Sequence, residues 1–137
     1  MLKNQVKREG RWTEIPAYLR ERARKKKCQV CGYPYGKIRH ADNGFVLMRE
    51  HLDHLIPRRF LEARGINPHQ VNVLLSVCCS CHGKKHGLED RIFQGDLASY
   101  LSGLRGLGYP VDRIIAFAVS VGLKEFQKFS FNERGAA

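Results

Sequence analysis

Residues 71–86 read VNVLLSVCCSCHGKKH, and this stretch decides the expected fold. Its first part, Val71 to Val77, is rich in valine and leucine and predicts a β-strand. The part that follows predicts a short helix that starts near Cys79 and ends at Gly87. A second strand is expected upstream, over Phe45 to Leu55, so two strands should precede the helix.

Four of the five cysteines form two C-x-x-C pairs, Cys28/Cys31 and Cys78/Cys81, with 46 residues between the pairs. Two intervening residues let both thiolates of a pair turn toward one cation, and two such pairs complete a tetrahedral zinc site. We therefore predict a structural Zn²⁺ bound by these four side chains. The fifth cysteine, Cys79, is interpreted as a bystander thiol.

Between the two cysteine pairs, residues 50–57 read EHLDHLIP and place His54 directly after Asp53. His82 follows the last cysteine, and on a helix it shares a face with His86, four residues later. A carboxylate together with a helical imidazole suits Mg²⁺, Mn²⁺ or a later transition metal. We predict that Asp53 and His82 bind a divalent cation, whereas His86 fits a further ligand and a solvent-facing residue equally well.

The order of these motifs resembles that of the HNH endonucleases. The shared elements are C-x-x-C, D-H-L-I-P, N-V-L-L and C-x-x-C-H-x-x-K. With the basic stretch IPAYLRERARKKKCQVCG that leads into the first cysteine pair, the resemblance covers about residues 13–88. The resemblance implies an α+β fold with a ββα-metal (His-Me finger) hairpin-plus-helix core, stapled by a four-cysteine zinc site and flanked by helices. Its diagnostic positions would be Asp53 with His54, then Asn72, then His82.

One spacing departs from the family pattern, in which the second cysteine pair begins five residues after the asparagine. Asn72 precedes Cys78 by six residues, and a β-bulge in the second strand would absorb the extra one. The alternative is that another asparagine takes this position, although Asn67 lies further from the pattern.

The resemblance and the side-chain chemistry agree on the roles of the candidate residues. His54 would be the general base, because a neutral imidazole with a pKa of about 6.5 can take a proton from water. Asp53 and His82 would hold the cation that stabilises the leaving 3′ oxygen. Asn72 would orient the His54 ring by a hydrogen bond. The expected reaction is hydrolysis of DNA phosphodiester bonds, nicking a duplex and leaving a 5′ phosphate and a 3′ hydroxyl.

The charge of the chain favours a polyanionic partner. It contains 24 Lys and Arg against 13 Asp and Glu, a net charge of +11, and residues 1–27 alone hold ten basic residues against three glutamates. Each phosphate that such a surface neutralises releases a counterion. Phosphate contacts are expected from four residues beside the candidate site: Arg58, Arg59, Lys84 and Lys85. The helix over residues 20–27 is expected to be a further basic patch.

Three parts are expected along the chain. Residues 1–12 are basic and should be mobile, residues 13–88 form the nuclease domain with its zinc site, and residues 89–137 form a helical hairpin and tail. Thr13 is a suitable N-cap for a first helix, whose last turn would be the basic run Arg24 to Lys27. The C-terminal hairpin is expected to pack on the middle part.

The remaining expectations concern the setting of the protein and the rival functions. The opening residues show no secretory signal, and the longest apolar stretch, residues 114–123, is too short to span a bilayer. We therefore expect a cytoplasmic protein that does not bind a membrane. Its expected partner is DNA, and its expected state is a monomer or a homodimer. The rivals are a non-catalytic zinc-stapled module that binds nucleic acid and an interaction protein built on a relic nuclease. His51 is expected to support the site, while His40 and His69 receive no role.

Overall fold

The computed structural model describes residues 7–8, 11–12, 14–41 and 44–130, and this part of the chain has a mixed α+β architecture. The strands are β1 (Lys7–Arg8), β2 (Arg11–Trp12), β3 (Ile38–Ala41), β4 (Gly44–Leu47), β5 (Glu50–His54) and β6 (Leu74–Cys78). The α-helices are α1 (Ala17–Ala23), α2 (Arg58–Glu62), α3 (Cys79–His86), α4 (Glu89–Phe93), α5 (Leu97–Leu107) and α6 (Val111–Ser120). Two 3₁₀-helices complete the list, η1 (Val71–Val73) and η2 (Lys124–Phe129).

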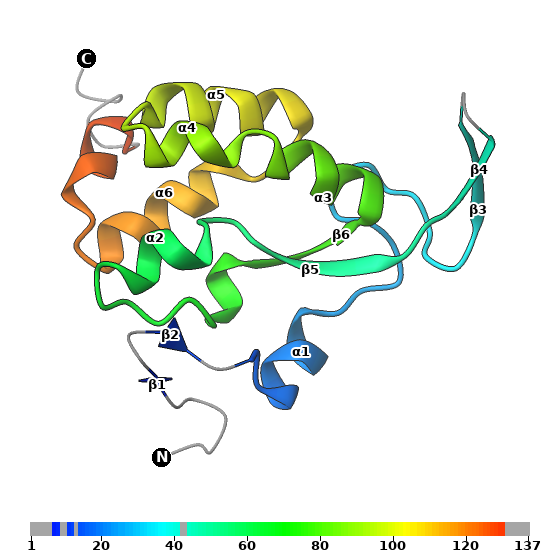
Figure 1. Cartoon of the computed structure of the whole chain (residues 1–137), viewed down its shortest axis with the longest axis horizontal. Coiled ribbons are helices and arrows are strands. Elements are labelled where there is room, and N and C mark those ends of the chain that lie inside the picture. Colours follow the sequence, from blue (N-terminus) through cyan, green and yellow to red (C-terminus); the bar gives the residue numbers. More distant parts are fainter. Residues whose placement is uncertain (1–6, 9–10, 13, 42–43, 131–137) are drawn as a thin grey trace.

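The centre of the molecule is the antiparallel pair β5–β6, which leads directly into α3 (Figure 1). Each residue of β5 faces one residue of β6, from Glu50 opposite Cys78 to His54 opposite Leu74. The β-bulge expected in the second strand is therefore absent from this pair. Helix α3 lies on one side of the two strands and α1 on the other, so successive residues of β5 face different helices.

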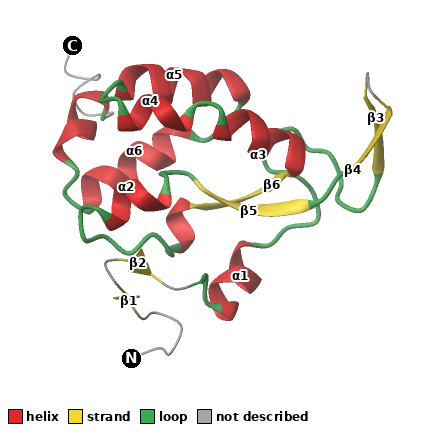
Figure 2. Cartoon of the chain, viewed as in Figure 1, coloured by secondary structure: helices red, strands yellow, loops and turns green. Residues whose placement is uncertain are grey.

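The strand expected over residues 45–55 is two strands in different sheets. β4 pairs with β3 in a hairpin that projects from the body (Figure 2), whereas β5 pairs with β6. The change of partner occurs at Met48 and Arg49: the Met48 amide still bonds to Lys37, while the Arg49 carbonyl accepts from the Cys79 amide. Met48 is fully buried, and its burial anchors the chain where it passes from one sheet to the other.

The strand expected over residues 71–77 begins only at Leu74, because residues 71–73 form η1. The Arg113 guanidinium from α6 donates to the carbonyls of Val71, Asn72 and Leu74 over 2.7, 2.9 and 3.1 Å. The valines of this segment favour a strand, but the hydrogen bonds from Arg113 satisfy the backbone carbonyls of the turn that forms instead.

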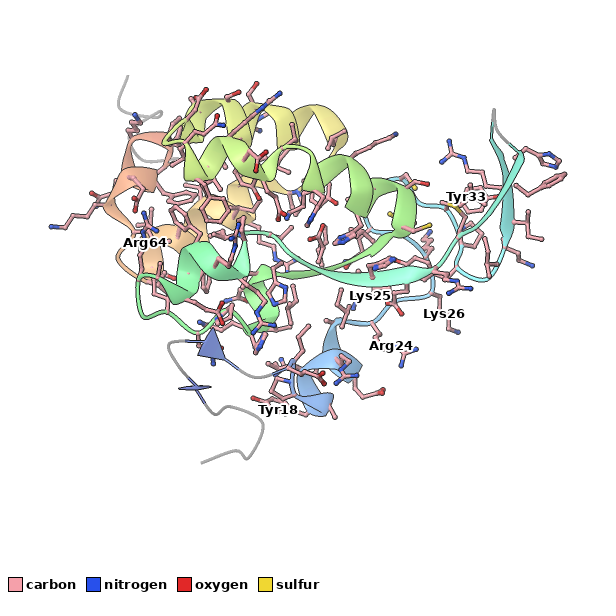
Figure 3. The ribbon with its side chains drawn as sticks, viewed as in Figure 1. Tyr18, Arg24, Lys25, Lys26, Tyr33 and Arg64 are labelled. Atoms are coloured by element: carbon pink, nitrogen blue, oxygen red, sulfur yellow. The ribbon has the colours of Figure 1, made fainter. Side chains whose placement is uncertain are left out.

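The first helix is shorter than expected. It spans Ala17–Ala23 with Pro16 at its N-cap, and Thr13 lies outside the described residues. The basic run after it is extended, and Figure 3 shows Arg24, Lys25 and Lys26 along the segment that follows α1. Arg24 and the backbone amide of Lys25 bond to Glu50 of β5, which draws the chain out of the helix.

The C-terminal half forms the expected pair of helices, α5 and α6, which turn at Gly108 with a left-handed φ of 96°. Both helices share one buried core with the middle of the chain. The Tyr100 hydroxyl of α5, for example, donates to the Leu55 carbonyl just beyond β5 over 2.7 Å. No helix in the described part of the chain is long and apolar enough to cross a membrane.

Candidate metal centres and active site

Four thiols come together where β6 passes into α3. The sulfur atoms of Cys28, Cys31, Cys78 and Cys81 all lie within 4.8 Å of one another and can hold a metal ion such as zinc. Among the described residues this is the one group of three or more ionisable ligands that meets so closely. Cys79 does not belong to it, because its thiol points to the Leu47 carbonyl at 3.6 Å.

Backbone amides prepare this cluster for a cation. The amides of Val30 and Cys31 each lie 3.4 Å from the Cys28 sulfur, and the Cys81 amide lies 3.4 Å from the Cys78 sulfur. Burial raises the pKa of the Cys28 thiol, but hydrogen bonds from the amides of Cys31, Cys78 and Val30 outweigh it and bring the pKa to about 7. Burial raises the pKa of the Cys81 thiol. A bound cation would therefore be needed to ionise all four thiols.

Asp53 is buried at the centre of a second cluster, between β5 and α3. Its Oδ2 accepts a hydrogen bond from the Tyr109 hydroxyl over 3.0 Å. Its Oδ1 lies 3.2 Å from Lys85 Nζ and 3.6 Å from His82 Nδ1. Burial pushes the pKa of Asp53 up, but His82 and Lys85 hold it below its ordinary value. Asp53 is therefore an anion held in one orientation.

His82 turns its Nδ1 toward this carboxylate. That nitrogen is buried and makes no hydrogen bond within the described part of the chain. Its ring stacks on His51 with the centroids 4.7 Å apart. The 3.6 Å between Nδ1 and Asp53 Oδ1 is shorter than two metal–ligand bonds of about 2.1 Å laid end to end. Both atoms can therefore bind the same cation.

His54 ends β5 and contacts a second histidine. Its Nε2 lies 3.2 Å from Nδ1 of His69, a side chain with only 1% of its surface exposed. Burial, followed by the charges of His69 and Arg58, lowers the pKa of His54 to about 3. The imidazole of His54 is accordingly neutral at physiological pH.

These groups line a cleft of 580 Å³, called the site cleft below. Its wall includes Asp53, His54, Arg58, Arg59, His82 and His86. Arg59 is exposed and lies over the Phe93 ring, with 5.0 Å from the guanidinium carbon to the ring centroid. Arg58 is half-buried and paired with Glu62 at 3.3 Å. The cleft thus brings together the predicted cation ligands, the predicted base and two arginines.

Lys84 and Lys85 differ sharply in their surroundings. Lys84 is exposed on α3. Lys85 has 1% of its side chain exposed, with Nζ between Asp53 Oδ1 at 3.2 Å and Glu89 Oε2 at 2.7 Å. An ammonium in that position balances two carboxylates and does not reach a phosphate in solvent, contrary to the expectation for Lys85.

Asn72 lies apart from the groups around Asp53, whereas His86 lines the site cleft with its ring centroid 5.7 Å from that of His82. The Asn72 side chain is exposed in η1, and the ring partner that the structure gives His54 is His69. His86 is 72% exposed, with Nδ1 2.9 Å from Glu89 Oε1. The roles predicted for Asn72 and His86 stay predictions.

Sequence reasoning missed two residues of this site, His69 and Tyr109. Neither carries a local signal of its role, because His69 lies in a loop and Tyr109 follows the glycine that ends α5. For Lys85 the sequence contains a weak indication: Glu89 follows four residues later, which is the spacing of an ion pair on a helix.

Comparison of the chain with family models, with curated proteins and with solved structures gives no match. The function is therefore inferred from the side chains described above.

Proposed function

We propose that the chain is a metal-dependent endonuclease of the HNH type that hydrolyses DNA phosphodiester bonds and nicks one strand of a duplex. The observation that carries the proposal is the unbonded His82 Nδ1, 3.6 Å from Asp53 Oδ1, with His54 next in sequence to Asp53. This nitrogen is within ion-pair distance of the carboxylate when the ring is protonated, and a divalent cation bound by both atoms would take the place of that proton.

Asp53 and His82 are the residues that would hold the divalent cation. An oxygen ligand beside an imidazole suits Mg²⁺ or Mn²⁺, and the Tyr109 hydroxyl and the Lys85 ammonium keep the carboxylate from rotating. When bound, such a cation stabilises negative charge on the scissile phosphate and on the leaving 3′ oxygen.

His54 would take the proton of the attacking water. The water oxygen forms a bond to phosphorus, the bond from phosphorus to the 3′ oxygen breaks, and the water proton passes to the imidazole. The products are a 5′ phosphate and a 3′ hydroxyl, the latter protonated from solvent. Burial, followed by the charges of His69 and Arg58, lowers the pKa of His54 to about 3 without substrate, and a phosphodiester anion in the site cleft would raise this pKa.

Arg58 and Arg59 would bind the DNA backbone. Both line the site cleft, and a guanidinium matches two phosphate oxygens at once. Such contacts position the backbone and read no base sequence, so the proposal concerns duplex DNA in general. The net charge of +11 supports the same partner.

The four-cysteine cluster would hold a structural Zn²⁺ that joins the loop after α1 to β6 and α3. A reducing compartment such as the cytoplasm would keep these thiols available for the ion. One site cleft per chain is sufficient to nick one strand, so a monomer is the working unit of this proposal.

The test uses supercoiled plasmid incubated with the purified full-length protein and Mg²⁺ or Mn²⁺. The variants are His54→Ala and, as a matched control, His40→Ala, because His40 is an exposed histidine on the projecting β3–β4 hairpin. We expect nicked circles from the wild type and from His40→Ala, and loss of cleavage in His54→Ala and in EDTA. Addition of Mg²⁺ alone after EDTA should restore activity if the zinc has stayed in place.

Two outcomes would contradict the proposal. Cleavage that persists in His54→Ala excludes His54 as the base. DNA binding without cleavage under any divalent metal would make the chain a non-catalytic zinc-stapled binding module.

A further inference from the structure

The contact between His54 and His69 joins β5 to the loop that precedes η1. The two rings approach through His54 Nε2 and His69 Nδ1, 3.2 Å apart, with the ring centroids 5.3 Å apart and the ring planes at 50°. His54 lines the site cleft, whereas His69 is 1% exposed behind it. His69 itself does not line the cleft but contacts His54, which does.

The loop holds His69 by its backbone. The Asn67 side-chain oxygen accepts a hydrogen bond from the His69 amide over 2.9 Å. The Gln70 side-chain amide donates to the Asn67 carbonyl over 2.7 Å. An asparagine that bonds to the amide two residues later fixes a tight turn, so the His69 ring has a defined direction before it meets His54.

One hydrogen atom lies between the two rings, and its position determines what His54 can do. If His69 Nδ1 donates, His54 carries its own hydrogen on Nδ1 and both of its nitrogens are occupied. If His54 Nε2 donates, its Nδ1 keeps a free lone pair. Only the second arrangement leaves His54 able to accept a proton from water.

We infer that His69 is a positioning residue for His54: its Nδ1 accepts the Nε2 hydrogen of His54 and thereby keeps His54 Nδ1 unprotonated toward the site cleft. This inference rests on the proposed function. When His54 takes the water proton, both of its nitrogens carry hydrogen and its bond to the His69 lone pair becomes charge-assisted. No proton passes to His69, so the step balances with water as the only proton donor.

The test compares two substitutions of His69 in the full-length protein. Asparagine keeps a hydrogen-bond acceptor near the position of Nδ1, whereas leucine fills similar space without one, and His40→Leu serves as the control for loss of a histidine elsewhere. We expect His69→Leu to lower kcat about 10- to 100-fold with an unchanged KM, the size of effect seen when a partner of a reacting group is removed. His69→Asn should recover most of that loss.

A second measurement reads the position of the hydrogen without any reaction. In ¹⁵N-histidine-labelled protein, long-range ¹⁵N–¹H correlations distinguish the two neutral forms of each ring. We expect His54 to carry its hydrogen on Nε2 in the wild type and in His69→Asn, and to populate both forms in His69→Leu. Observation of the Nδ1–H form of His54 in the wild type overturns the inference even if His69→Leu fails to fold.

The two proposals fail in different ways. A wild type that binds DNA but cuts none overturns the proposed function together with the catalytic role of His69. A protein that cuts DNA, loses cleavage in His54→Ala and keeps its kcat in His69→Leu overturns the inference alone. Equal losses in His69→Asn and His69→Leu would likewise show that the acceptor atom has no part.

Discussion

At the scale of single residues, the buried charges of this chain lie beside opposite charges. Lys85 Nζ is bonded to Asp53 and Glu89, and the Tyr109 hydroxyl reaches both Asp53 and the Cys81 carbonyl, at 3.0 and 3.2 Å. Burial and the neighbouring Asp53 raise the pKa of Tyr109, so its hydroxyl remains a donor. Such a network adds less stability than its number of bonds suggests, because each charge lost hydration on burial, but it defines one orientation for Asp53.

Glu50 provides a prediction about pH. Its carboxylate accepts from the Ser76 hydroxyl at 2.6 Å and from the Lys25 amide at 3.0 Å. Burial alone would raise the pKa of Glu50, but these bonds and Arg24 lower it from 4.5. We expect Glu50→Gln to reduce the free energy of unfolding at pH 7 by about 1 kcal/mol.

The sign of the pH dependence follows from the lowered pKa. The ionised carboxylate stabilises the fold above the ordinary value of 4.5, and the stabilisation disappears as the pH falls through the lower folded value. The difference between wild type and Glu50→Gln in urea unfolding should therefore shrink below pH 4.5. Glu21→Gln is the control, because Glu21 is 78% exposed and 3.9 Å from Arg24. A difference that stays constant with pH would exclude the ionised carboxylate as its cause.

At the scale of elements, the cysteine cluster joins the loop after α1 to the point where β6 passes into α3. Cys28 and Cys31 belong to the loop after α1, Cys78 ends β6, and Cys81 lies in the first turn of α3. A cation bound there fixes the start of α3, the helix that carries His82. The metal cluster and the candidate active site are thus connected through one short helix.

We expect Cys28→Ser to lose the bound zinc and to unfold at a lower temperature, because the binding free energy of a structural zinc is part of the folding free energy. Cys79→Ser is the matched control, since its thiol points away from the cluster. Metal analysis and thermal unfolding by circular dichroism measure both effects. A Cys28→Ser protein with full zinc content and unchanged melting would rule out a structural site at these cysteines.

At the scale of the whole molecule, the C-terminal helices reach into the candidate site. Tyr100 of α5 bonds to the chain just beyond β5, Arg113 of α6 bonds to η1, and Tyr109 between these helices bonds to Asp53. The C-terminal hairpin, which was expected to pack on the middle part, thus also contacts the candidate cation ligand and the turn before β6.

The distribution of exposed charge gives a prediction for DNA binding. Arg59 in the site cleft and Lys84 on α3 are exposed, whereas Lys85 is buried in ion pairs. The double variant Arg59→Ala/Lys84→Ala should lower the slope of log Kd against log salt concentration by about 0.9 for each lost phosphate contact. Fluorescence anisotropy with a labelled duplex and no divalent metal measures this slope.

The matched control for this prediction removes two exposed lysines of η2, Lys124 and Lys128, which do not line the site cleft. We expect the control to leave the slope within the error of the wild type. Equal slopes in both double variants would assign the charge dependence to the overall charge of the chain instead of to the site cleft.

The sequence by itself determined the features that depend on short-range spacing. The two C-x-x-C pairs predicted the four-thiol cluster, because two intervening residues let both thiolates of a pair turn toward one cation. The helical hairpin expected within residues 89–137 corresponds to α5 and α6. An α+β fold with a strand leading into a short helix at Cys79 was likewise predictable.

Only the tertiary structure decided which groups surround Asp53 and His54. Lys85 and Lys84 are neighbours in sequence, yet one is buried because Asp53 and Glu89 lie beside it and the other faces solvent. His69 and Tyr109 come from distant segments, and no local pattern marks either of them. Free energy from long-range burial and hydrogen bonding exceeds the small local preferences that a sequence displays, so the partners of these groups emerge only when the chain is folded.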